Sequence, residues 1–433
     1  MILTLLVFAA SIMVLVGVHE GGHFLTAKAF GVYVKEFAIG FGPRLLQRRG
    51  RETVYTLRLI PFGGYVRMAG EDQLETEDDI PEDRVLYNKP PYARALISLA
   101  GPATNLALAF VLTLVVIWAT PFPLMQVADV IDGAPAAAVL QFGDRILEID
   151  GHRIFTYDQI TERINAADGD PLDILLERDG ESVHVAVQAD YEEAESRYVI
   201  GAYFSNAALT NEIDSVASPS SLDVLGMRPG DRIVAVGGAP TDTLVSIELA
   251  ANDILPAPEI TFTLERDGER FDVAVPSAGQ TVYEVLDPLT FAHWGIVNQR
   301  AGFGQGIALA ARQFVGYIRA LAELVHSVIA GQTDASDAFQ GPIGVAQLLG
   351  ESARIGASFF FQLLAFLSLN FGLINLVPFP ALDGSRAVFA VYEWVRGKPI
   401  PPQREGIIHA IGFLILIGLM ILITYQDIAR LFR

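Results

Sequence analysis

Residues 14–30 read VLVGVHEGGHFLTAKAF, a stretch that places two histidines and a glutamate inside an otherwise apolar run long enough to cross a lipid bilayer. An ionisable side chain at the centre of a membrane helix costs about 2.5–3.5 kcal/mol on insertion scales, so such residues are rare and usually serve a function. His19 and His23 are four residues apart and therefore share one face of a helix, with Glu20 beside them. The stretch predicts a membrane helix that carries a chemical site.

The composition of the whole chain also favours a membrane protein. Hydrophobic residues make up 52% of the 433 positions, and cysteine is absent, which excludes disulfides and thiolate metal sites. Four segments are long and apolar enough for helices in lipid, at about 2–27, 95–118, 356–377 and 407–425. The first begins directly at Met1 without a basic leader or a small-residue cleavage site, so we do not expect a signal peptide. We therefore expect a polytopic α-helical membrane protein with four transmembrane helices.

Charge along the chain predicts the orientation of these helices. The net charge is −20, and residues 126–280 contain 29 acidic against 9 basic side chains. Residues 24–70 contain eight basic against two acidic side chains, and the short loop after the third apolar segment adds Arg386, Arg396, Lys398 and Arg404. Short basic loops remain in the cytoplasm, so both basic segments should face it and the acidic segment should lie outside. Nothing here suggests a nucleic-acid partner.

The acidic segment contains an internal repeat. GDRILEIDG at 143–151 recurs as GDRIVAVGG at 230–238, and LERDGE at 176–181 recurs at 264–269. Two copies of one small domain therefore follow each other, each with short alternating strands separated by Asp-Gly and Gly-Gly turns. The stretches PAAAVLQFGDRILEIDG and SLDVLGMRPGDRIVAVGG resemble the bacterial PDZ domain. The resemblance implies two PDZ-like α+β domains; an unrelated repeated β-domain is the alternative.

Two further segments are predicted to lie at the membrane. Residues 51–68, RETVYTLRLIPFGGYVRM, alternate like strands and include a Pro-Phe-Gly-Gly turn, which predicts a β-hairpin. A sheet edge cannot face lipid, so the hairpin must be buried in protein or line a wet cavity, where another chain could pair with it. Residues 304–330 are apolar but interrupted by four ionisable side chains, a pattern that favours an amphipathic helix over a membrane span.

His19, Glu20 and His23 form an H-E-x-x-H motif. Two imidazoles four residues apart on a helix can bind one zinc ion, and the adjacent glutamate can take a proton from a zinc-bound water. A catalytic zinc needs a third protein ligand, and Lys28 and Glu36 fit this role poorly. The better candidate is Asp383, an isolated carboxylate that follows two prolines at the end of the third apolar segment, on the same predicted side of the membrane as His23.

Together, H-E-x-x-H in the first apolar segment and NLVPFPALDG at 375–384 resemble the site-2 protease family of intramembrane zinc metalloproteases. Tandem PDZ-like copies between the second and third segments are similar to its RseP-type branch, the regulators of sigma-E. PFGGYVRM at 61–68 resembles the family's membrane-reentrant hairpin, AGPATN at 100–105 its second-span motif, and GPIGVAQ at 341–347 the approach to its third span. One departure is Ser385-Arg386, where relatives often have Gly-His.

The resemblance implies roles for individual residues. His19, His23 and Asp383 would be the zinc ligands and Glu20 the general base, in agreement with their spacing. The resemblance also implies a set of substrate-binding positions in the spans and the hairpin: Asn375, Pro380, Asn370, Asn105, Gly63 and Gly64. Asn105 and Asn370 could instead form hydrogen bonds between helices. His152, His184, His293, His326 and His409 lack ligand spacing, so we interpret them as surface or core residues.

The expected function is Zn²⁺-dependent hydrolysis of single-span membrane proteins within the bilayer, after an earlier cleavage has removed their outer domain. The resemblance implies anti-sigma factors or remnant signal peptides as substrates, in a bacterial inner membrane, with the active site toward the cytoplasm and the PDZ-like copies in the periplasm. A catalytically idle PDZ scaffold and a metal transporter are the alternatives. Glu20 argues against the first. The second and fourth apolar segments lack ligand residues apart from His409 and Asp427 near their ends, which argues against the second.

These observations divide the chain into nine segments. The four membrane segments are expected at 1–27, 95–120, 353–384 and 406–426, and the two PDZ-like copies at 124–200 and 201–279. Between them we expect the hairpin region at 28–94, an amphipathic helical linker at 280–352 and a cytoplasmic loop at 385–405.

Overall fold

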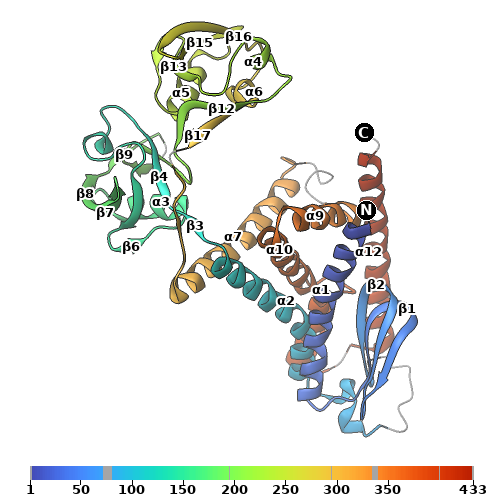
Figure 1. Ribbon diagram of the computed structural model, residues 1–433. Coiled ribbons are helices and arrows are strands. Elements are labelled where there is room, and N and C mark those ends of the chain that lie inside the picture. Colours follow the sequence, from blue (N-terminus) through green and yellow to red (C-terminus); the bar gives the residue numbers. More distant parts are fainter. Residues whose placement is uncertain are drawn as a thin grey trace. The chain divides into compact units, whose positions relative to one another are not determined.

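A computed structural model describes residues 2–71, 80–194, 196–293, 295–333, 340–398 and 400–431. The chain divides into two compact units (Figure 1), one formed by Met1–Thr120 with Ala301–Arg433 and the other by Pro121–Arg300. The first unit contains the apolar helices, and the second contains both copies of the repeat.

The described part of the first unit contains four helices long and apolar enough to cross a membrane, as predicted. They are α1 (Ile2–Ala29), α2 (Pro91–Ala119), α10 (Ala357–Leu376) and α12 (Pro402–Leu431). α2 packs against both α1 and α10 (Figure 1). Small residues allow the close approach: a Cβ on Gly22 of α1 would lie 2.4 Å from the carbonyl oxygen of Ala100 in α2.

The β-hairpin of this unit is larger than the segment predicted at 51–68. It comprises β1 (Val34–Arg49) and β2 (Val54–Met68), which flank α1 (Figure 1). β1 uses both of its edges near its start, because Ile39 pairs with Gly64 on one side and with Leu57 on the other. Gly63 adopts a φ of +85° where the chain turns back, a conformation that favours glycine. The segment 64–68 therefore forms an outer strand of the hairpin.

The third apolar segment is more interrupted than predicted. α9 (Pro342–Ile355) ends at Gly356, α10 follows, and the chain leaves α10 at Val377, before its two prolines. Asp383 is the first residue of a new helix, α11 (Asp383–Arg396), so it does not end the preceding span. Most of the loop predicted at 385–405 is thus helical. The small residues of α11, including Ala387 and Ala390, pack against Ala95 of α2, a long-range contact that local sequence does not reveal.

The second unit contains two sheets with the same strand order. Strands β11 (Ala202–Ser205), β4 (Met125–Val130), β5 (Arg145–Ile149), β7 (Pro171–Arg178) and β8 (Glu181–Gln188) lie in that order in copy 1. Copy 2 repeats it with β17 (Leu289–His293), β12 (Leu209–Val216), β13 (Arg232–Val236), β15 (Glu259–Arg266) and β16 (Glu269–Pro276). α3 (Tyr157–Ala166) and α5 (Leu244–Ile254) occupy equivalent positions between strands.

Shorter elements complete the described chain. The second unit also contains β3 (Phe122–Pro123), β6 (His152–Arg153), β9 (Asp190–Glu192), β10 (Arg197–Val199), β14 (Ala239–Pro240), β18 (Asn298–Gln299), α4 (Ser221–Val224), α6 (Val282–Leu286) and the 3₁₀ turn η3 (Pro135–Ala138). The 3₁₀ turns η1 (Glu82–Arg84) and η2 (Leu86–Asn88) precede α2, and α7 (Phe303–Ile329) lies against it.

The predicted ends of both copies are too early. β11 closes the sheet of copy 1 although it lies beyond residue 200, and β17 closes the sheet of copy 2 beyond residue 279. In copy 1 the short strands β9 and β10 lie between the repeated motifs and the closing strand, and in copy 2 the short helix α6 does. Each closing strand pairs with the first strand of its sheet. Such pairing over many residues leaves no mark in the local pattern. Of the linker predicted at 280–352, α7 and α9 therefore remain, and its start belongs to copy 2.

Within each copy, the GDRI motif contacts the LERDGE motif through a buried ion pair. In copy 2, Asp231 of the GDRI motif is fully buried and accepts hydrogen bonds from Arg266 Nε and Nη2, at 2.6 and 2.8 Å, and from the backbone of Arg228. Asp144 and Arg178 form the same arrangement in copy 1. Because a buried carboxylate requires a partner, each motif fixes the other. The motifs therefore stabilise the fold.

Candidate functional site

Three side chains from distant parts of the sequence meet inside the first unit. His19 Nε2 lies 2.9 Å from Asp383 Oδ2, His23 Nε2 lies 3.3 Å from the same oxygen, and the two imidazole nitrogens lie 3.3 Å apart. Both imidazoles are buried, whereas the Asp383 side chain is 20% exposed. α1 supplies the histidines, and the turn into α11 supplies the carboxylate. Within the described residues, this is the group of three donors that could hold a metal ion.

The spacing of these donors fits zinc. Two ligand atoms about 2.0–2.1 Å from a tetrahedral zinc lie about 3.3 Å from each other. The three observed separations cluster around that value. A three-ligand set leaves a fourth position for water, as catalytic zinc sites require.

α2 orients both imidazoles. His23 Nδ1 donates a hydrogen bond to the carbonyl oxygen of Ile97 at 2.7 Å, which leaves its Nε2 lone pair directed at the cluster. The amide nitrogen of Asn105 lies 3.4 Å from His19 Nδ1, while its buried oxygen has no hydrogen-bond partner. If the amide is turned over, its oxygen accepts a hydrogen bond from the N–H at His19 Nδ1. This arrangement favours a role for Asn105 in holding His19.

Gly101 of α2 leaves room for the His23 ring. A Cβ on Gly101 of α2 would lie 2.2 Å from His23 Nε2, far inside van der Waals contact. In the H-E-G-G-H motif the two glycines differ, since Gly22 faces the α2 backbone closely and Gly21 has nothing within 4 Å. The site therefore depends on small residues in both helices.

Asp383 is held as an anion. Burial alone would raise the pKa of its carboxyl group, but hydrogen bonds with His19 and His23 outweigh this effect and hold that pKa well below its ordinary value. A deprotonated carboxylate is the form that binds a metal ion.

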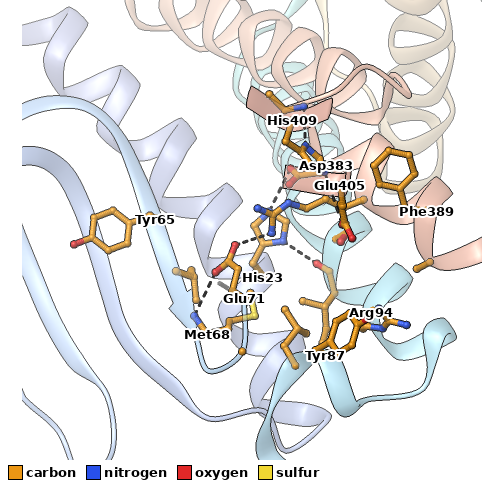
Figure 2. A pocket seen from close by; sticks show the side chains of 18 of the residues that line it. His23, Tyr65, Met68, Glu71, Tyr87, Arg94, Asp383, Phe389, Glu405 and His409 are labelled. Atoms are coloured by element: carbon orange, nitrogen blue, oxygen red, sulfur yellow. Dashed lines mark hydrogen bonds and ion pairs between the residues drawn. The ribbon is translucent and has the colours of Figure 1, made fainter. Parts of the chain in front are cut away.

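The cluster opens into a cavity of about 940 Å³. Glu20, half-buried on α1, lines it, and so do Gly64–Met68 of the hairpin's outer strand. Figure 2 shows residues from the hairpin, α2, α11 and α12 around this space. The cavity thus brings the predicted ligands, the predicted base and a strand edge together.

The other predicted positions fall in two groups. Gly64 lines the cavity and packs on Glu20, since a Cβ there would lie 3.2 Å from Glu20 Cγ. Asn375 lies in the last turn of α10, where its side chain donates to the carbonyl oxygen of Phe371 at 2.9 Å, and Asn370 has a buried oxygen without a hydrogen-bond partner. The other predicted substrate-binding residues do not line the cavity: Gly63, Asn105, Asn370, Asn375 and Pro380.

Sequence reasoning missed several cavity residues. Arg386 forms an ion pair of 2.6 Å with Glu71 after the hairpin, and Arg94 of α2 forms one of 2.6 Å with Glu393 of α11. His409, interpreted above as a surface or core residue, lines the cavity and accepts a hydrogen bond from the loop before Asp383. The departure from the family pattern at Arg386 was the one available signal, and it pointed only to the loop.

Comparison with known proteins identifies the family of the chain. Residues 7–419 match the model of peptidase family M50. The chain is 29% identical to the zinc metalloprotease RasP of Shouchella clausii, over 99% of both chains, and 29% identical to the regulator of sigma-E protease RseP of Escherichia coli, over 98% of both. A solved PDZ domain of an SdrC-like protein from Listeria monocytogenes covers 18% of this chain and 85% of its own, at 26% identity and a TM-score of 0.18.

The family match spans both donor segments, and the relatives that cover nearly the whole chain are zinc metalloproteases. Zn²⁺ is therefore the expected cofactor. The chain belongs to peptidase family M50, the site-2 proteases, and is a zinc metalloprotease of that type.

Proposed function

We propose that the protein hydrolyses peptide bonds inside the membrane, in single-span proteins whose outer domain has already been removed. His19, His23 and Asp383 hold the zinc ion, and Glu20 is the general base. The observation that carries this proposal is the meeting of these three donors on helices that include a predicted membrane span. A hydrolytic centre at that depth can reach a bond that soluble proteases cannot.

Each residue of the site has a distinct task. A zinc ion held by His19, His23 and Asp383 would supply Lewis-acid chemistry, polarising the scissile carbonyl and lowering the pKa of a water molecule. Glu20, on the same helical turn as the ligands, would take a proton from the attacking water and return it to the leaving amine. Ile97 and Asn105 hold the imidazoles in the orientation that binding needs. Gly101 keeps the space for His23 open.

The substrate must unwind before it can be cut, because helical amides are shielded by their own hydrogen bonds. An unwound segment in lipid needs new partners for its N–H and C=O groups. The outer strand at 64–68 supplies a strand edge beside Glu20, where an extended substrate can add as a further strand. Asn375 and Asn370 at the end of α10, with Pro380, Gly63 and Asn105, are the further positions that we assign to substrate handling.

Anti-sigma factors and remnant signal peptides are the substrates we propose; the name of the Escherichia coli relative, regulator of sigma-E protease, supports the first of these. The two basic segments support an active site toward the cytoplasm of a bacterial inner membrane, with both copies in the periplasm. Two domains outside the membrane can exclude substrates that still carry a bulky outer domain.

The proposal is tested with purified full-length protein in liposomes and a single-span reporter, made with and without a folded outer domain. We expect zinc-dependent cleavage of the short reporter within its span and little cleavage of the long one. His23→Ala and Asp383→Ala should lose both zinc and cleavage, whereas the control His326→Ala, on an exposed position of α7, should keep both. Cleavage by Asp383→Ala at the wild-type rate would contradict the assignment.

A further inference from the structure

The loop that delivers Asp383 is held in a demanding conformation. Between α10 and α11, Ala381 has a φ of +78°, in the left-handed region that residues with a Cβ rarely adopt. Such a conformation persists only where neighbouring groups fix it. Within the loop, the Leu382 N–H donates to the carbonyl oxygen of Phe379 at 3.0 Å.

A side chain from another helix completes this support. The N–H of Ala381 donates a hydrogen bond of 3.0 Å to Nδ1 of His409 in α12 (Figure 2). α12 also touches the loop three residues further on, where a Cβ on Gly412 would lie 2.3 Å from the carbonyl oxygen of Pro380. The loop is therefore fixed on the helix that follows α11.

Among the described residues, the His409 ring forms no hydrogen bond other than the one with Ala381. Because Nδ1 accepts a hydrogen bond, the ring proton lies on Nε2, and that buried atom has no hydrogen-bond partner. The nearest carboxylate oxygen, of Glu405, is 3.9 Å away, beyond hydrogen-bond distance. The ring stacks edge-on against Phe389 of α11, with centroids 5.6 Å apart. Its one hydrogen bond is thus the one to the loop.

A small displacement of this loop would move Asp383 relative to His19 and His23. Asp383 lies two residues after Ala381, and metal–ligand distances tolerate only about 0.2 Å of error. A carboxylate that loses its orientation no longer lies 2.9 Å from His19 Nε2 and 3.3 Å from His23 Nε2.

We propose that His409 is a positioning residue for the zinc site: through its hydrogen bond to Ala381 it fixes the loop that directs Asp383 at the two imidazoles. α12, which supplies no ligand, thereby determines how tightly the third ligand binds. This inference rests on the proposed roles of His19, His23 and Asp383.

The test measures zinc affinity of the full-length protein in detergent by competition with a chelator, and the visible spectrum of its Co²⁺ form. His409→Leu keeps the side chain's bulk and removes the acceptor, whereas His409→Asn retains an oxygen that can replace Nδ1. We expect zinc affinity to fall about 10- to 100-fold in His409→Leu, the range typical of lost outer-sphere partners. The Co²⁺ bands should change with it, and His409→Asn should stay near wild type. His326→Leu is the matched control.

Three results would contradict the inference. Equal affinities and Co²⁺ spectra for wild type and His409→Leu would show that the ring only packs. Equal losses in the Leu and Asn variants would show that ring shape matters and the hydrogen bond does not. Absence of zinc binding in the wild type would overturn the proposed function as well, whereas binding that depends on Asp383 but not on His409 would overturn this inference alone.

Discussion

Substituting Gly101 with alanine should empty the metal site without changing any ligand. The added Cβ would lie 2.2 Å from His23 Nε2 and 2.7 and 2.8 Å from the adjacent ring carbons. Carbon and nitrogen atoms in contact lie about 3.5 Å apart, so the ring must move by about 1.3 Å. This displacement is several times the about 0.2 Å that metal ligation tolerates.

His23 cannot move freely to accommodate that methyl group. Its Nδ1 is fixed to the carbonyl oxygen of Ile97 at 2.7 Å, so a shift of the ring breaks this hydrogen bond too. We expect zinc affinity to fall by at least about 100-fold, the upper end of the effect of outer-sphere changes, because a ligand itself is displaced. Cleavage of the reporter should fall in parallel.

The assay compares Gly101→Ala with Gly21→Ala, which adds the same methyl group between the two histidines, where nothing lies within 4 Å. Both changes raise helix propensity by about 1 kcal/mol, so a difference between them reports the contact alone. Zinc is measured by chelator competition and folding by thermal denaturation. Wild-type zinc affinity in a folded Gly101→Ala variant would refute the reasoning.

Two further predictions concern stability. Asp231→Ala should lower the free energy of unfolding of copy 2 by about 3 kcal/mol, since it leaves Arg266 without its buried partner. Arg270→Ala, which removes an exposed ion pair, should lower it by less than about 1 kcal/mol. Protease resistance of the full chain on heating measures both effects, and equal losses would contradict the prediction. Asp427→Ala should destabilise the start of α9 by about 1–3 kcal/mol, because the buried carboxylate accepts from three backbone N–H groups at 3.0–3.1 Å. Faster hydrogen exchange at Gly344 checks this, and unchanged exchange would disprove it.

The sequence predicts the site well where local pattern carries the information. His19 and His23 share one face wherever this segment is helical, and the apolar run around them predicts a membrane span. The repeated motifs also predict two equivalent domains, but the sequence does not show why these motifs recur. The reason is the Asp231–Arg266 ion pair, which joins the GDRI and LERDGE motifs within copy 2.

The parts that could not be predicted depend on contacts over long distances. The closing strand β17 pairs with a strand far earlier in the chain, as in Leu289 with Val216, and no local signal marks it. Gly101 appears in the sequence as one more small residue of a membrane helix, and its importance lies in the single ring that it faces. His409 has no ligand spacing because it holds a loop instead of a metal ion.

The most direct test of the central claim pairs the wild type with Glu20→Gln, in liposomes that contain the single-span reporter, and follows bound zinc and cleavage together. Glutamine keeps the size of the side chain and loses the ability to accept the proton of water. We predict equal zinc content in both proteins and cleavage by the wild type alone. Cleavage by both at the same rate, or no zinc in either, would contradict it, and the polar residues of α1 would then be structural.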